Sequence, residues 1–305
     1  MYTNTDLMMK STKGASMKEY INAISMQMRL MINKKEFQIT YIINAGYVLL
    51  TYLYYVIYYW GDDVSTVSSS SAVFALLTKS VFFDLYISIV PFLVVLPFAM
   101  SFVDDKKNYI LPGLQVRSGV KVYYISKAVA CFLGGFFSFF IPMMIGMLLN
   151  GLTFPESGIT FLGDYFDMNF DAAVTGADVL IRTRWAGLWF PRLFISSPDG
   201  YNILFCTFFS IAMGISSTFL YIVSFFIKRQ KLLLMLPFFL IVSVLNIMDE
   251  FNMEHPPYVC FKVMQYITVN AMYGKNPLYI YFFLLLMILV SVFGINRQIQ
   301  RDQLD

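Results

Sequence analysis

Six long apolar stretches constrain the fold of this chain more than any other feature of its sequence. They cover approximately residues 39–60, 81–103, 124–152, 203–227, 232–248 and 278–295. A helix needs roughly 20 mostly apolar residues to cross the hydrocarbon core of a bilayer, and each stretch approaches or exceeds that length. We therefore expect an all-α polytopic membrane protein with six transmembrane helices.

The composition supports a membrane-embedded chain. Apolar residues make up 58% of its 305 residues and charged residues only 13%, whereas soluble domains carry about 25% charged residues. The net charge of +3 is small, and no dense basic patch is interleaved with aromatic residues, so we expect no nucleic-acid partner. The three cysteines, Cys131, Cys206 and Cys260, form no spacing typical of a disulfide framework or a metal site.

The distribution of Lys and Arg predicts the orientation. With the N-terminus in the cytoplasm, 16 of the 22 basic residues fall in four inner segments, which are residues 1–38, 102–127, 228–231 and 296–305. Short cytoplasmic segments carry an excess of Lys and Arg. We therefore expect a multi-pass protein of a bacterial plasma membrane with both termini in the cytoplasm.

Residues 1–38 form a cytoplasmic N-terminal region, and residues 39–305 form the six-span domain. Within 16–37, apolar side chains fall on one arc of a helix and polar ones mostly opposite. This pattern predicts an amphipathic helix that lies along the inner membrane surface before the first span. Such a helix could anchor the chain alone, or it could also form part of a docking surface.

Three outer segments differ in character. Residues 62–72, "DDVSTVSSSSA", are typical of a flexible connector. The loop 153–202 is long enough to form a small outer cap, and its Arg182, Arg184, Trp185 and Trp189 are typical of an interfacial anchor. The semi-polar segment 249–277 contains an apolar run too short to cross a membrane, which predicts a re-entrant or interfacial segment before span six.

The sequence lacks several kinds of chemistry. There is no GxxxxGK[ST] loop for ATP phosphates, and His255 is the single histidine. The spans hold few polar groups that could line a pathway, and the candidates are Asn44 and Asp84. Asp84 also fits a residue at headgroup level, just where the second span enters the bilayer. In the third span, Gly134, Gly135, Pro142 and Gly146 favour a bend or close helix contacts.

Charge is concentrated in the cytoplasmic segment 102–127. From Asp104 it reads "DDKKNYILPGLQVRSGVKVYYISK". "DDKKNYI" predicts a short helix with Asp104 and Asp105 at its positive end, "LPG" predicts a break, and "QVRSGVKVYYISK" predicts the start of the third span. A helix–break–helix at the membrane surface is a suitable contact for another protein.

This layout resembles the membrane (permease) subunit of ABC-2 type transporters. The resemblance is carried by the amphipathic helix, the six spans, the outer segment before the last span and the motif "F-x-D-D-K…LPGLQVRSG…YYISK". Asp104 or Asp105, Arg117 and Lys127 match the family's acidic and basic positions in the coupling segment. The chain departs from the family in two respects. Its loop between spans three and four has about 50 residues, whereas the family commonly has a short loop there. It also has two Asp residues where the family often has Glu.

The resemblance implies a transporter subunit that is not itself an enzyme and binds no cofactor. ATP and Mg²⁺ would belong to a separate ABC ATPase subunit, and a second membrane subunit, identical or related, would complete the assembly in the bilayer. The residues expected to contact or couple to the ATPase are Asp104, Asp105, Lys106, Lys107, Gly113, Arg117, Lys121, Lys127, Lys228 and Arg229.

The apolar spans and the aromatic outer cap suit export of a peptide or another amphipathic or lipophilic molecule, including a role in self-resistance or immunity. Two other classes stay open: an ion-coupled secondary carrier, and a membrane scaffold that transports nothing. A membrane enzyme would need paired catalytic groups within the spans, and the sequence does not supply them.

Overall fold

The computed structural model describes residues 16–64, 66–74, 76, 82–156, 190, 193, 196–227, 231–253, 260–268 and 277–304. Every extended regular element in these ranges is a helix. Four helices are long and apolar enough to cross a membrane: α3 (Lys35–Tyr58), α7 (Val120–Thr153), α12 (Pro198–Val223) and α15 (Pro277–Leu304). They correspond to the predicted first, third, fourth and sixth spans and indicate a multi-pass membrane protein.

The predicted second span, 81–103, is not one continuous helix. It is divided into α4 (Phe83–Leu93), a run of turns over 94–100 and α5 (Ser101–Lys107). Pro91 and Pro97 each remove a backbone donor, which favours a break in the helix. Val94, Val95 and Ala99 in the turns between α4 and α5 are fully buried, so this stretch packs inside the protein.

The predicted fifth span is represented by a shorter unit. A 3₁₀ helix, η1 (Lys231–Leu234), precedes α13 (Leu236–Met253), which contacts α4. α13 has 18 residues, about 27 Å of helix. Its last turns carry the acidic residues Asp249 and Glu250, so the apolar part is shorter than the hydrocarbon core of a bilayer.

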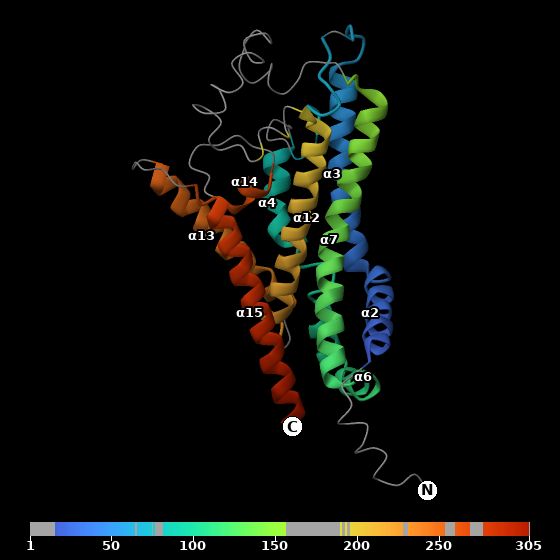
Figure 1. Ribbon diagram of the computed structural model, residues 1–305, viewed down its shortest axis with the longest axis vertical. Coiled ribbons are helices and arrows are strands. Elements are labelled where there is room, and N and C mark those ends of the chain that lie inside the picture. Colours follow the sequence, from blue (N-terminus) through green and yellow to red (C-terminus); the bar gives the residue numbers. More distant parts are fainter. Residues whose placement is uncertain are drawn as a thin grey trace.

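Close contact between α7 and α12 forms the centre of the bundle (Figure 1). A Cβ atom built on Gly214 of α12 would lie 2.8 Å from the carbonyl oxygen of Phe132 in α7. A Cβ atom on Gly135 would lie 3.0 Å from the Cα atom of Gly214. Small residues at a helix crossing let two backbones approach closely, as the glycines of this segment predicted. α7 itself runs unbroken through Pro142.

The predicted amphipathic helix is present as α2 (Met17–Ile32). Ser16 and Glu19 form a capping box that satisfies backbone donors at its start. α2 lies lengthwise beside α7 (Figure 1) and buries Ala23, Gln27 and Met31, so it also packs against the bundle. Its position along the membrane surface stays a prediction. Gly134 of α7 leaves room for the Met31 side chain: a Cβ there would lie 2.2 Å from its sulfur.

The segment predicted as a flexible connector is folded where the structure describes it. Residues 66–74, here called the strap, are hydrogen-bonded to the last turns of α7 and the first turns of α12. The backbone N–H of Ser70 donates to the Pro155 carbonyl (3.1 Å). Asn150 of α7 donates to the Val73 carbonyl (3.2 Å), and Asn202 of α12 donates to the Ser71 carbonyl (2.9 Å). Amide side chains thus satisfy strap carbonyls that would otherwise lack partners.

The predicted re-entrant segment, 249–277, packs against the bundle where it is described. The short helix α14 (Val263–Ile267) contacts α12, α13 and α15, and Tyr266 and Ile267 are buried. Asp249, fully buried at the end of α13, accepts the Phe261 backbone N–H at 2.6 Å. Partial burial lowers the pKa of Lys262, but its contacts with Glu250 and Asp249 outweigh this and raise the pKa above its usual value.

Candidate functional site

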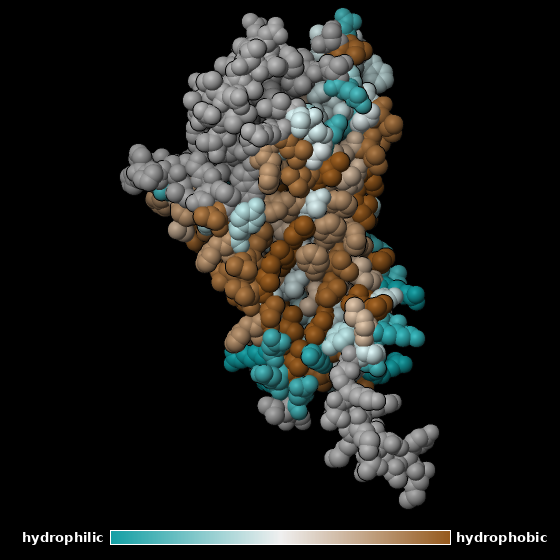
Figure 2. Space-filling model, in the orientation of Figure 1, coloured by the Kyte–Doolittle hydropathy of each residue, from teal (hydrophilic) through white to brown (hydrophobic). Residues whose placement is uncertain are grey.

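Hydrophilic residues gather at the end of the bundle where α2 begins and α15 ends, below a broad apolar band (Figure 2). We call this the basic end. It contains α5 and also α6 (Leu111–Ser118), which has no buried residue. "LPG" was predicted to break the chain, but it starts α6 because Pro is favoured in a first helical turn. One break falls just before it, at 108–110, and a second at Gly119, whose φ of 80° suits glycine.

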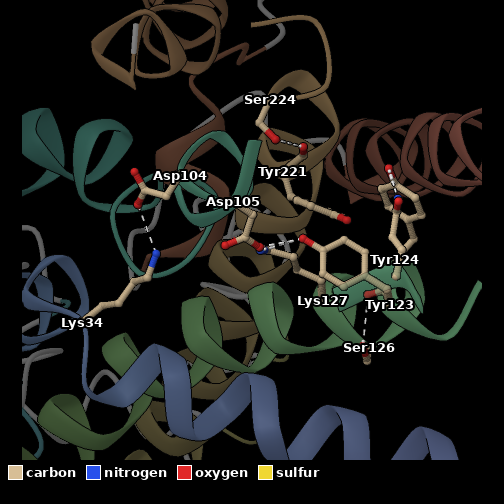
Figure 3. A network of polar contacts seen from close by, with 10 residues as sticks. Lys34, Asp104, Asp105, Tyr123, Tyr124, Ser126, Lys127, Tyr221 and Ser224 are labelled. Atoms are coloured by element: carbon tan, nitrogen blue, oxygen red, sulfur yellow. Dashed lines mark hydrogen bonds and ion pairs between the residues drawn. The ribbon is translucent and has the colours of Figure 1, made fainter. Parts of the chain in front are cut away.

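Asp105 of α5 forms an ion pair with Lys127 of α7 (Figure 3). Tyr123, one turn before Lys127, donates its hydroxyl to Asp105 at 2.6 Å and accepts from the Lys127 ammonium at 3.1 Å. The Lys127 side chain is 1% exposed and also lies 5.3 Å from the centre of the Phe98 ring. A buried ammonium needs such partners, because an isolated charge in an apolar interior is very costly.

Asp104, the neighbouring carboxylate, points to a different part of the bundle. It pairs with Lys34, at the junction of α2 and α3, at 3.1 Å (Figure 3). The two side chains are 20% and 28% exposed respectively, so water screens this pair more than the Asp105–Lys127 pair. The two adjacent acids of α5 therefore hold two separate elements.

α5 makes a third contact, with the end of α12. Lys106 donates to the Phe225 carbonyl at 3.4 Å, just beyond the last residue of α12. Phe102, completely buried, packs its ring against Tyr124, Tyr221 and Phe225. Edge-to-face aromatic pairs of this kind add about 0.5–1.5 kcal/mol each beyond their buried area. The seven residues of α5 are thus fixed to the α2–α3 junction, α7 and the end of α12.

The C-terminal turn of α15 also joins this end. Asp302 accepts from the Tyr124 hydroxyl (2.5 Å) and from the Gln115 amide of α6 (2.8 Å). The contacts of Lys34 with Asp104 and of Gln115 with Asp302 bring three of the four predicted inner regions, 1–38, 102–127 and 296–305, to one end of the molecule. Lys106 adds a contact to Phe225, just before the fourth region.

α6 and the two residues before it expose apolar and basic side chains. Val116 and Tyr109 are each 87% exposed, and Ile110 is 49% exposed. Arg117 is also exposed, and a Cβ atom built on Gly113 would meet nothing within 4 Å. Tyr109 adopts a φ of 56°, an uncommon conformation for a non-glycine residue.

The structure separates the predicted site residues into groups. Asp104, Asp105, Lys106 and Lys127 meet in the network just described, while Lys107, Gly113, Arg117 and Lys121 lie exposed at the same end. Outside the described residues lie Lys228, Arg229, Arg182, Arg184, Trp185 and Trp189.

The two predicted pathway residues do not come together. Asn44 is fully buried, donates to the Ser138 carbonyl of α7 at 2.8 Å and accepts from the Tyr86 hydroxyl of α4 at 3.0 Å. Asp84 is exposed in the first turn of α4. Asn44 therefore joins three helices inside the bundle, and Asp84 faces outward, as a residue at headgroup level would.

Several members of the network were not predicted from the sequence. Lys34, Tyr123, Tyr124 and Asp302 looked like ordinary charged or aromatic residues near helix ends. Tyr123 and Lys127 lie one turn apart on α7, a spacing that places two side chains on one face. That spacing indicates that Tyr123 and Lys127 could share a partner. Only the position of α5 identifies this partner as Asp105.

The described part of the chain contains no group of three His, Cys, Asp or Glu side chains that could hold a metal ion. No family model, no curated protein and no solved structure matches this chain. The resemblance to ABC-2 permeases therefore rests on the layout and the coupling segment of the sequence.

Proposed function

We propose that this chain is the membrane subunit of an ATP-driven exporter of the ABC-2 type. In this proposal it crosses the plasma membrane six times, with α4 and α13 belonging to the second and fifth crossings, and keeps both termini in the cytoplasm. A separate ABC ATPase binds ATP and Mg²⁺, and a second membrane subunit completes the transport pathway. The cargo is a peptide or another amphipathic or lipophilic molecule.

The observation that carries the proposal is the construction of the basic end. α6 offers an exposed apolar and basic face, and α5 beside it is fixed by directed polar contacts to three other elements. A partner that pushes on α6 would move α5, and α5 would transmit the displacement through Asp105 to α7 and through Asp104 to the α2–α3 junction. Discrete packed and hydrogen-bonded contacts are the physical means by which such coupling travels.

The electrostatics of this end fit the same role. Basic residues on α2, α5, α6 and α15 outnumber the acidic ones there, which favours a cytoplasmic location and an acidic docking face on the partner. The chain has no phosphate-binding loop of its own, so the energy source in this proposal is the partner.

Affinity purification in mild detergent tests the proposal. We expect an ATPase with a phosphate-binding loop to co-purify with the chain and to hydrolyse ATP. Val116→Glu should reduce its recovery about tenfold, because an unpaired charge would enter an apolar contact. The matched control is Val64→Glu, which places the same charge on a 68% exposed residue near the opposite end. An intact complex without any ATPase would refute the proposal.

An ion-coupled carrier is the second candidate, and buried charge favours it. Lys127 and Asp249 are both buried within the helical bundle, and such residues often belong to ion pathways. Reconstituted vesicles distinguish the two functions. A carrier would move cargo in response to a pH or sodium gradient with the purified chain alone, whereas an ATPase-dependent subunit would need its partner and ATP.

A further inference from the structure

A groove with a volume of about 350 Å³ opens between α7, α12 and α15. On α7 it is lined by the turn that follows Lys127, and on α15 by residues 288–295. It therefore lies toward the basic end. All three helices are long and apolar enough to cross a membrane, so in a bilayer a groove between them would lie at the depth of the lipid hydrocarbon. Its walls include Ala128, Phe132, Ile215, Ser291, Val292 and Ile295.

The walls of the groove suit hydrocarbon. Two hydroxyl groups contribute to the lining, but each donates its proton within its own helix. Thr218 donates to the Gly214 carbonyl at 3.0 Å, and Ser291 donates to the Met287 carbonyl at 2.7 Å. The lining therefore has no free hydroxyl proton for a polar ligand, and a polar group placed there would lose its hydrogen bonds to water without replacement.

A positive charge lies beyond the groove, toward the basic end. Lys121 precedes Ala128 by seven residues on α7, so it lies on the same side of the helix about 10 Å away. It is exposed. Asp302 is the nearby acid, and its carboxylate is already engaged by Tyr124, Gln115 and Gln298. An anion at the mouth of the groove would therefore have the exposed ammonium of Lys121 on the same side of α7.

We propose that this groove binds one acyl chain of an anionic phospholipid from the bilayer leaflet at the basic end, and that Lys121 binds the phosphate. The volume lies at the lower end of the range for small-molecule sites, about 300–1,000 Å³, which fits part of one chain. Basic side chains near a membrane surface attract anionic lipids and give the site its headgroup preference. The site holds lipid whether or not the chain works with an ATPase.

Photolabelling tests this site directly. The full chain is placed in nanodiscs of phosphatidylcholine that contain a trace of phosphatidylglycerol with a photoreactive group on its acyl chain. We expect labelled peptides to concentrate at 128–132 of α7 and 288–295 of α15. Unlabelled phosphatidylglycerol should compete at about fivefold lower concentration than phosphatidylcholine, the advantage expected from one Lys near the surface.

Two matched pairs of variants make the test specific. Val292→Phe fills the groove and should reduce labelling at least about fivefold. Val290→Phe makes the same change on the opposite side of α15 and should leave labelling unchanged. The two valines are similarly exposed, at 53% and 41%. Lys121→Gln should abolish the preference for phosphatidylglycerol but keep acyl-chain labelling, and Lys18→Gln on α2 should change neither.

Three results would overturn the site. Labelling spread evenly over all lipid-facing helices would mean ordinary contact with the bilayer. Equal losses in Val292→Phe and Val290→Phe would mean a general disturbance of α15. An unlabelled groove, together with disulfide formation between two copies carrying Val292→Cys, would mean that a second copy of the chain covers it. None of these readouts depends on ATP hydrolysis, so they leave the proposed function to its own test.

Discussion

Two adjacent carboxylates of α5 have the same chemistry and different surroundings. Asp105 pairs with Lys127, whose side chain is 1% exposed, and Asp104 pairs with Lys34, whose side chain is 28% exposed. Neighbouring helix positions lie about 100° apart around the axis, so they reach different elements. Burial of the partner, rather than the sequence motif, therefore decides how much each acid contributes to stability.

We predict that Asp105→Asn lowers the free energy of unfolding by about 3–5 kcal/mol, because it leaves the buried Lys127 charge without its counterion. Asp104→Asn is the matched control, and it should cost less than about 1 kcal/mol because both partners reach solvent. Thermal unfolding of the purified variants in one detergent measures both. Equal losses for the two variants would contradict this assignment.

The double variant Asp105→Asn with Lys127→Met separates the ion pair from the packing. It removes both charges and keeps a long side chain at 127, so stability should recover toward that of the original chain. A double variant as unstable as Asp105→Asn alone would show that the Asp105 position is needed for another reason.

The sequence pointed to both partners of the Asp105–Lys127 pair. In the Lys34–Asp104 pair it pointed only to Asp104. Asp104, Asp105 and Lys127 stood out because they carry charge beside an apolar stretch. Lys34 is one of several lysines that end an amphipathic segment, and Asp302 is one acid in a polar C-terminal turn. Their roles depend on how α2 and α15 pack, which no local pattern contains.

Among the helices, prediction from the sequence succeeded where hydrophobicity and length agree. α3, α7, α12 and α15 are long, apolar and continuous, so a length criterion was sufficient to find them. The stretch 81–103 is equally apolar, but two prolines divide it and neighbouring helices cover its turns. Hydropathy alone cannot distinguish burial in protein from burial in lipid.

The crossing of α7 and α12 yields a prediction for this pair of helices. Gly214→Ala should lower the free energy of unfolding by about 1–3 kcal/mol, because the new methyl group meets the Phe132 backbone. Gly46→Ala in α3 is the control: a Cβ atom there meets nothing within 4 Å, so helix propensity should make it neutral or stabilising by about 0.5–1 kcal/mol. Unfolding midpoints of both variants check the difference, and similar midpoints would argue against close helix contact.

For the whole molecule, three of the four predicted inner regions share one end although they are far apart in the chain. The link Lys34–Asp104 joins 1–38 to 102–127, and Gln115–Asp302 joins 102–127 to 296–305. Lys106–Phe225 links 102–127 to the end of the chain segment that precedes 228–231. The excess of Lys and Arg predicted that these regions lie on one side of the membrane. Which side is cytoplasmic follows from charge statistics and needs a direct measurement.

Cysteine labelling provides that measurement. The native cysteines are fully buried, so they should remain unlabelled by a membrane-impermeant maleimide. We expect Val116→Cys to react only after the cells are opened and Val64→Cys to react in intact cells, since these residues are exposed near opposite ends. Reaction of Val116→Cys in intact cells would reverse the orientation.

The length of α7 has a consequence for the far end of the molecule. One helix, with no interruption, contains both Lys127, paired with Asp105, and Asn150, bonded to the strap. These two residues are about 35 Å apart along the axis. A pivot of about 5° around Lys127 would swing Asn150 through about 3 Å, more than a hydrogen bond tolerates. A small rotation of α7 at the basic end would thus break the hydrogen bond between Asn150 and the strap at the opposite end of this helix.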